Sequence, residues 1–135
     1  MDLLEFQGKS LLARAGVPVP EGRVARTPEE AGQAAAELGG PVVVKAQVQV
    51  GGRGKAGGIK AAASPSEAEQ VASVILGMDI RGHRVGLVWV ERATEIAAEW
   101  YASFTLDRGS GHHLAMLSAR GGMDIEAVAA ADAAA

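Results

Sequence analysis

The 135-residue chain contains no cysteine, which excludes disulfide bonds, thiolate zinc sites and a cysteine nucleophile. Aromatic residues make up only 4% of the sequence, and alanine supplies much of its 48% apolar content, so we expect a thin hydrophobic core. No apolar run approaches the roughly 20 residues of a membrane-spanning helix. The N-terminal sequence MDLLEF begins with an acid and lacks the pattern of a secretory signal, so we expect a cytoplasmic protein.

The chain as a whole also carries no net positive charge. Thirteen Lys and Arg residues against sixteen Asp and Glu residues give a net charge of −3, which argues against a general nucleic-acid-binding role. Residues 38–66 depart from this acidic background, because they contain no acid and four basic residues: Lys45, Arg53, Lys55 and Lys60.

A glycine-rich loop occupies the middle of this basic segment. It follows an apolar run that ends in Lys45 and contains five glycines, namely Gly51, Gly52, Gly54, Gly57 and Gly58. Glycines let backbone N–H groups approach an anion closely, and basic side chains add charge. The spacing matches neither the Walker A loop nor the dinucleotide fingerprint, and strands are predicted on both sides. The pattern favours a β-hairpin flap over nucleotide phosphates; a mobile surface hairpin is the alternative.

The order of predicted elements indicates an α/β or α+β fold whose C-terminal part is incomplete. We predict a helix over residues 2–15, capped by Asp2, with an apolar stripe built by Leu3, Leu4, Leu11 and Leu12. Capping boxes predict two further helices. The expected elements after the first helix are a strand at 22–25, a helix at 28–38, strands at 41–48 and 59–63, a helix to residue 76, a turn at 82–84, a strand at 85–91, a half-buried strand at 100–107, its returning partner at 113–119, and a helix starting near 124.

Few polar residues outside the loop point to chemistry. Lys45 must either extend to solvent or meet an anion. Glu91 follows an apolar strand and Glu99 comes eight residues later, so each carboxylate is either a ribose acceptor or an ordinary surface group. The three histidines stand in or beside predicted turns without an orienting partner. We therefore assign no catalytic residue and no metal ligand.

Four segments together resemble the N-terminal part of the β subunit of succinyl-CoA synthetase (succinate–CoA ligase). They are MDLLEFQGKSLLARAGVPVP, VVVKAQVQVGGRGKAGGIK, VERATEIAAEWY and RGGMDIE, and the resemblance extends from residue 1 to about residue 130. It implies an ATP-grasp fold, in which ATP is held between two α/β lobes. Residues 1–20 would belong to the larger lobe, residues 21–92 would form the small subdomain with its glycine-rich flap, and residues 93–135 would begin an incomplete second lobe.

The resemblance also implies ATP as ligand and a role for each matching residue. Lys45 would contact the nucleotide phosphates, while Gly52, Arg53 and Gly54 would form the covering loop. The base pocket would be lined by Glu91 and Thr94, and the ribose would be held by Glu99. Such ligases couple succinate and CoA to nucleotide cleavage, through an acyl phosphate and a phosphohistidine on a partner α subunit.

Three departures from the family bear on activity. The family's β subunit is far longer, and its Mg²⁺-binding Asn and Asp have no counterpart here. The domain that contacts CoA and the α subunit also has no counterpart. The family usually has an acid where Arg120 precedes Gly121. We therefore expect the isolated chain to be inactive alone, because phosphoryl transfer depends on bound metal for charge neutralisation.

Three interpretations stay open at this stage. The chain is a nucleotide-binding part of an acid–CoA ligase, a truncated stand-alone ATP-binding module without turnover, or part of a related malate–CoA ligase or ATP citrate lyase subunit. Pro20 lies where the family meets the base and offers no hydrogen bond to guanine, which favours ATP over GTP. An incomplete lobe would expose sheet edges and apolar surface, so we expect self-association or a protein partner.

Overall fold

The computed structural model describes residues 2–119 and 121, and the chain divides into two compact units, Met1–Thr94 and Glu95–Ala135. The first unit contains α1 (Glu5–Arg14), β1 (Gly22–Ala25), α2 (Pro28–Leu38), β2 (Val42–Ala46), β3 (Ile59–Ala62), α3 (Pro65–Ile75), β4 (Asp79–Ile80), β5 (His83–Arg84) and β6 (Val88–Arg92). The second contains β7 (Tyr101–Asp107) and β8 (His112–Ser118). None of the helices in this described part has the length and continuous apolar sequence that a bilayer crossing needs.

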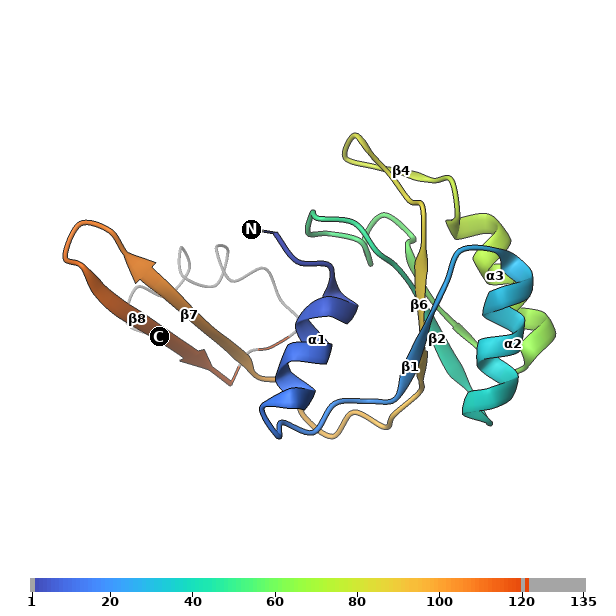
Figure 1. Cartoon of the computed structure of the whole chain (residues 1–135), viewed down its shortest axis with the longest axis horizontal. Helices are drawn as coiled ribbons and strands as arrows, with labels where there is room; N and C mark the ends of the chain where they lie inside the picture. The colour runs from blue at the N-terminus through green and yellow to red at the C-terminus, as the bar shows by residue number, and fades with distance from the viewer. Residues whose placement is uncertain (1, 120, 122–135) are drawn as a thin grey trace. The chain divides into compact units, whose positions relative to one another are not determined.

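The first unit is built on a four-stranded sheet in the order β1-β6-β2-β3, with every neighbouring pair antiparallel. In Figure 1, α2 and α3 cover one face of this sheet and α1 lies on the opposite side. The mixed α/β architecture expected from the sequence is therefore confirmed.

Alternation along the strands gives this sheet two different faces. In β2, Val42 and Val44 are fully buried in the core formed with α2 and α3, whereas Lys45 between Val44 and Ala46 is only partly buried. In β6, Val88 and Val90 are buried in the same core. The core consists mainly of alanine and valine, as the low aromatic content predicts. The face opposite the core is therefore free to carry polar side chains.

Both predicted capping boxes start helices where expected. The Thr27 hydroxyl accepts a hydrogen bond from the Glu30 N–H, and the Ser64 hydroxyl accepts one from the Glu67 N–H, each at 3.2 Å. A proline follows each cap at the first helical position, where a missing N–H costs nothing. These local signals position the two helices that cover the core.

The prediction for α1 needs correction at its start and along its surface. Leu4, not Asp2, is the N-cap residue, and its N–H donates to the Gln7 side chain at 2.9 Å. The expected apolar stripe does not enter the core, because Leu3, Leu11 and Leu12 are 43%, 52% and 50% exposed. Instead α1 meets the sheet through polar contacts and one aromatic pair, described below.

Three strand predictions also change. The expected strand at 41–48 ends at Ala46, and the expected strand at 85–91 begins only at Val88. The turn expected at 82–84 lies at residues 81–82, and His83 and Arg84 form the second strand of the two-stranded hairpin of β4 and β5. Val85 extends this hairpin, because its N–H donates to the Met78 carbonyl and its carbonyl accepts from the Gly77 N–H, both at 2.9 Å. A continuous apolar sequence gives no signal for where one ladder ends and the next begins.

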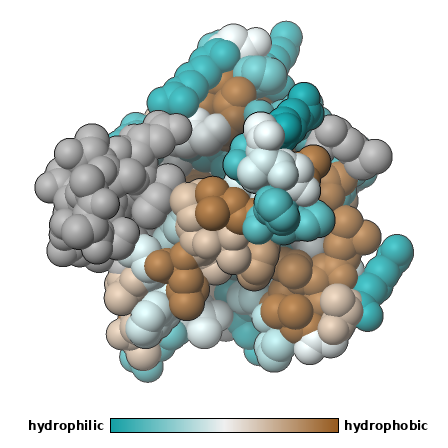
Figure 2. Space-filling model, turned by 90° about the vertical axis from the view of Figure 1, so that its left-hand side faces the viewer, coloured by the Kyte–Doolittle hydropathy of each residue, from teal (hydrophilic) through white to brown (hydrophobic). Residues whose placement is uncertain are grey.

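The second unit contains the predicted hairpin, with Tyr101 opposite Ser118 and Asp107 opposite His112. Its expected burial is wrong, because Phe104 is 81% exposed and Leu106 is 52% exposed. Two strands alone cannot bury either face, and the described residues place no further layer on them in this unit. Figure 2 views the molecule from the left-hand side of Figure 1 and shows patches of hydrophobic surface, coloured brown, on that face. Arg120 and the helix expected near residue 124 lie outside the described residues.

Candidate functional site

Lys45 lies on the sheet face opposite the core and meets two carboxylates. Its Nζ donates to Glu91 Oε1 at 2.6 Å and to Glu5 Oε1 at 3.3 Å. Glu91 stands beside it because β2 and β6 are paired, and Glu5 comes from the first turn of α1. The lysine therefore meets anions rather than extending into solvent, and the anions belong to the protein itself.

Arg53, from the glycine loop, reaches the same place. Its Nη1 donates to Glu5 Oε2 and to the Ala46 carbonyl, each at 2.8 Å. Lys9, one helical turn after Glu5, contacts Glu5 at 3.1 Å and also bonds Glu91 Oε2. We call Glu5, Lys9, Lys45, Arg53 and Glu91 the charge cluster. Three cations and two carboxylates leave it with a net charge of +1, so it can accept a further anion.

Aromatic and small residues hold this arrangement in place. The Trp89 indole N–H donates to Glu91 Oε2 at 2.8 Å, and the Trp89 ring stacks on Phe6 of α1 with centroids 6.1 Å apart. Gly22 of β1 also lies against the indole, where an added Cβ would come within 2.3 Å of a ring atom. Trp89 thus fixes the carboxylate of Glu91 and anchors α1 to the sheet.

The pKa values of the cluster reflect its ion pairs. Burial by itself raises the pKa of Glu5, but the positive charges of Lys45 and Arg53 and the contacts with Lys9 outweigh it and lower the pKa to about 2. Burial likewise raises the pKa of Glu91, yet its hydrogen bonds from Lys45, Lys9 and Trp89 bring the pKa below 4.5. Burial lowers the pKa of Lys45, but hydrogen bonding to Glu91 and the charges of both glutamates raise it above 10.5 overall.

These shifts predict a loss of stability in acid. A carboxyl whose folded-state pKa is depressed stabilises the fold fully above its unfolded pKa, near 4.5, and stops doing so as pH falls through its folded pKa. For Glu5, with a folded pKa of about 2, the free energy of unfolding should fall by about 2 to 3 kcal/mol between pH 5 and pH 2. Urea denaturation at a series of pH values measures this dependence.

The matched variants are Glu5→Gln and Glu95→Gln, the second at an exposed acid for which no ion pair is found in the described residues. Glu5→Gln should remove its share of the slope, whereas Glu95→Gln should leave the slope unchanged. An identical pH dependence for Glu5→Gln and the unmodified chain would contradict the role given to this carboxylate.

The glycine loop itself is a folded turn structure rather than an extended flap. Its base is closed by hydrogen bonds from the Ala46 N–H to the Gly58 carbonyl at 2.7 Å and from the Gly58 N–H to the Arg53 carbonyl at 2.8 Å. The loop connects the antiparallel strands β2 and β3, as the flap interpretation requires. Within the described part of the chain, the backbone N–H groups of residues 51–55 donate to no acceptor. They are available to an external anion.

The structure thus brings together three of the seven predicted site residues, Lys45, Arg53 and Glu91. Gly52 and Gly54 lie in the loop that carries Arg53. Thr94 is exposed at the end of the first unit. Glu99 belongs to the second unit, where its carbonyl accepts a hydrogen bond from the Gly121 N–H.

Sequence reasoning missed the contribution of α1 to this site. Glu5 and Lys9 supply one carboxylate and one ammonium group to the charge cluster. Their spacing of four residues was the available signal, because such pairs share one face of a helix. Nothing in the sequence indicated that this face would meet Lys45.

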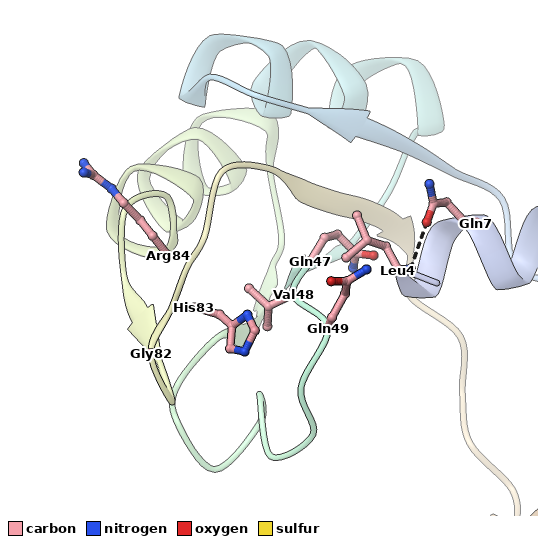
Figure 3. A pocket seen from close by; sticks show the side chains of 8 residues that line it. All are labelled: Leu4, Gln7, Gln47, Val48, Gln49, Gly82, His83 and Arg84. Atoms are coloured by element: carbon pink, nitrogen blue, oxygen red, sulfur yellow. Dashed lines mark hydrogen bonds between the residues drawn. The ribbon is translucent and has the colours of Figure 1, made fainter. Parts of the chain in front are cut away.

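An open cavity of about 510 Å³ lies beside the cluster, between the start of α1, the segment that follows β2, and the β4–β5 hairpin. Figure 3 shows the side chains that line it: Leu4, Gln7, Gln47, Val48, Gln49, His83 and Arg84, together with Gly82. The amides of Gln47 and Gln7 are used internally, since Gln47 Oε1 accepts from the Phe6 N–H at 3.2 Å and Gln7 Oε1 accepts from the Leu4 N–H at 2.9 Å. Among the described residues, no group of three or more His, Asp or Glu side chains is placed to hold a metal ion.

Comparison with known proteins places this chain in a family. The family model described as the ATP-grasp domain matches residues 2–135. The β subunit of a GDP-forming succinate–CoA ligase from Thermus thermophilus is 57% identical over 130 residues, which are 96% of this chain and 34% of that protein. The chain therefore spans about a third of the length of this relative. The resemblance to the N-terminal part of such a subunit is confirmed.

Two solved structures show the same fold at low sequence identity. A protein of Pyrococcus horikoshii matches with a TM-score of 0.74 and 24% identity, over 93% of this chain and 55% of that one. A dinucleotide-forming acetyl-coenzyme A synthetase of Ca. Korarchaeum cryptofilum, in complex with coenzyme A, Ca-AMPCP and HgCl⁺, matches with a TM-score of 0.73 and 24% identity, over 86% and 52%. On the match to its family model, the chain belongs to the ATP-grasp domain family.

Proposed function

We propose that this chain is the nucleotide-binding part of an acid–CoA ligase of the succinyl-CoA synthetase type, and that it holds the phosphates of ATP. One observation carries the proposal. Lys45 and Arg53 both contact Glu5, which brings Lys45 to the glycine loop that carries Arg53. The backbone N–H groups of residues 51–55 in this loop find no acceptor in the described chain. Cationic side chains combined with successive open N–H groups are the donor set that phosphate oxygens require.

The residues present fit the polyphosphate of a nucleotide. The cluster retains a net charge of +1 after its internal ion pairs, and the loop exposes further positive charge at Lys55. Glu5 and Glu91 hold the two central cations in position before ligand arrives. A phosphate would then share or replace the contacts that Glu5 makes with Lys45 and Arg53. Bound ATP supplies the phosphoryl group, and cleavage of ATP drives acid–CoA ligation in such enzymes.

The remaining roles belong to the same proposal. Gly52 and Gly54 would let the loop backbone approach the phosphates, Glu91 and Thr94 would line the base pocket, and Glu99 would hold the ribose. The Glu91 carboxylate is already bonded to Lys45, Lys9 and Trp89, so its side chain also serves as the counter-ion that orients Lys45.

The choice of base needs its own test. The Thermus thermophilus relative carries the description GDP-forming, whereas Pro20 of this chain offers guanine no hydrogen bond. We propose ATP as the preferred nucleotide, with Mg²⁺ bound to its phosphates. On the same resemblance, we propose that an α subunit completes the ligase. We also propose that the chain associates with itself or with a partner through its exposed apolar surface.

Thermal unfolding of the purified chain tests the proposal. A ligand that binds only the folded state raises its stability, so MgATP at about 100 times its dissociation constant should raise the unfolding midpoint by about 10 °C. AMP should raise it far less, because it lacks the β- and γ-phosphates. MgGTP in a parallel series reports the base preference. No shift with either triphosphate in a folded sample would contradict the proposed nucleotide site.

A further inference from the structure

The β4–β5 hairpin touches the glycine loop at two separate points. The guanidinium of Arg81, at the tip of the hairpin, lies against Gly52, where a Cβ would come within 3.2 Å of Arg81 Nη2. Ile80, the residue before it, lies against Gly58, where a Cβ would come within 2.8 Å of Ile80 Cδ1. The Ile80 contact leaves no room for a side chain at Gly58, whereas a side chain at Gly52 would push the Arg81 guanidinium away from the loop.

The two contacts differ in character. Ile80 is 1% exposed and belongs to the hydrophobic core, so it fixes the base of the loop, where Gly58 closes onto Ala46. Arg81 is exposed, and within the described residues it forms no ion pair and no hydrogen bond. Its guanidinium is therefore not held in this position by a carboxylate. It covers Gly52 as a flat cationic group on the first half of the loop.

The backbone at Arg81 is unusual for such a side chain. Arg81 has φ of 54° and Gly82 has φ of 82°, so both turn residues occupy the left-handed region, as a two-residue hairpin turn of this kind requires. Glycine, asparagine and aspartate are the residues that suit these positions, and a long side chain is disfavoured there. The Asp79 side chain accepts from the Gly82 N–H at 2.9 Å and secures the turn. An arginine at a position better suited to glycine points to a role for its side chain.

We propose that Arg81 is a positioning residue that clamps the glycine loop, so that Gly52 and Arg53 are preset for the phosphates of the nucleotide. The inference rests on the proposed function for its purpose, but the clamp itself is a property of the ligand-free chain. Presetting a loop removes part of the ordering cost of binding. Loss of the clamp should therefore free the loop first and weaken nucleotide binding as a consequence.

Limited trypsin digestion of the ligand-free chain measures the clamp directly. Trypsin cuts after Arg53 and Lys55 only when the loop opens, and mass spectrometry identifies each cut. Arg81→Gly should raise the cleavage rate after Lys55 about fivefold, since loss of the packing of the guanidinium on Gly52 shifts the opening equilibrium by that order. The variant should fold, because glycine suits the left-handed backbone at this turn.

Matched variants separate the clamp from a general effect of charge. Arg84→Ala removes another exposed cation of the same hairpin and should leave the cleavage rate unchanged. Arg81→Lys keeps the charge but loses the planar guanidinium, so it should rescue the slow cleavage only in part. Gly52→Ala should accelerate cleavage like Arg81→Gly, because it displaces the guanidinium and strains a residue with φ of 81°.

Titration with MgATP completes the experiment. If Arg81→Gly speeds cleavage and also weakens MgATP binding about fivefold, the positioning role is supported. If cleavage accelerates while the unmodified chain binds no nucleotide, the clamp stands and the proposed function fails. An unchanged cleavage rate in Arg81→Gly, in a sample that remains folded, overturns the clamp whatever the nucleotide does.

Discussion

Replacing Glu91 by alanine should destabilise the first unit by about 3 to 5 kcal/mol, because removing a buried partner from the ion pairs leaves three cations with Glu5 as the one remaining carboxylate of the charge cluster. Glu91 is only 6% exposed and is bonded to Lys45, Lys9 and the indole N–H of Trp89. Alanine would leave the indole N–H of Trp89 without its acceptor and would remove one of the two carboxylates that Lys45 and Lys9 contact. A loss of this size is a large fraction of the stability of an ordinary domain.

Urea denaturation followed by far-ultraviolet circular dichroism measures this loss. Glu91→Gln keeps the size of the side chain and an acceptor oxygen, so it should cost clearly less than Glu91→Ala. Glu69→Ala, at an exposed acid of α3, serves as the surface control and should change the unfolding free energy by about 0.5 kcal/mol or less. Equal effects of Glu91→Ala and Glu69→Ala would contradict the buried counter-ion role.

A double variant sharpens the interpretation. Glu91→Ala together with Lys45→Ala should cost less than the sum of the two single changes, because each single change strands the partner. A coupling of about 1 to 3 kcal/mol is expected for groups 2.6 Å apart in a partly buried site. Strict additivity would mean that the two side chains contribute independently.

The sequence predicted those parts of the fold that local signals determine. Thr27 and Ser64 start their helices as expected, because a cap and a following proline act within one turn of the backbone. The strand that contains Lys45 and the antiparallel return after the glycine loop are also present, because β-branched apolar runs on either side of a glycine-rich segment favour a hairpin. Boundaries within continuous apolar segments were less predictable, so β6 begins at Val88 instead of residue 85.

The contacts of α1 were beyond what periodicity can show. Its leucines suggested a buried stripe, yet Leu11 and Leu12 are about half exposed and the helix meets the sheet through Glu5 and Phe6. A carboxylate on a helix finds its partner through tertiary packing, which depends on residues 40 or more positions away. The strand pairing on either side of the predicted turn at 82–84 was likewise hidden, because an arginine occupies a turn position where glycine or asparagine is the usual hairpin signal.

The candidate site was predictable to the extent that its residues are neighbours in sequence or in one sheet. Lys45 and Arg53 come together because a short loop joins them, and Glu91 joins Lys45 through strand pairing. Thr94 and Glu99 lie beyond the four-stranded sheet, where neither loop length nor strand pairing predicts their neighbours. The resemblance supplied ATP as the proposed ligand, whereas charge and glycine content alone favoured a nucleotide or another anion.

Calorimetric titration with MgATP is the most direct test of the central claim, that Lys45 and Arg53 hold nucleotide phosphates. The unmodified chain should bind MgATP saturably. Lys45→Ala/Arg53→Ala should weaken binding at least about 100-fold, because each charged hydrogen bond contributes about 1.5 to 3 kcal/mol. Lys60→Ala, which removes an exposed cation of β3, should bind as the unmodified chain does.

Circular dichroism confirms folding of each variant, and Lys45→Gln/Arg53→Gln provides a second pair that retains hydrogen-bond donors. Saturable binding lost only in the variants at positions 45 and 53 is the predicted result; undiminished MgATP binding by folded Lys45→Ala/Arg53→Ala, or none by the folded unmodified chain, would contradict the account.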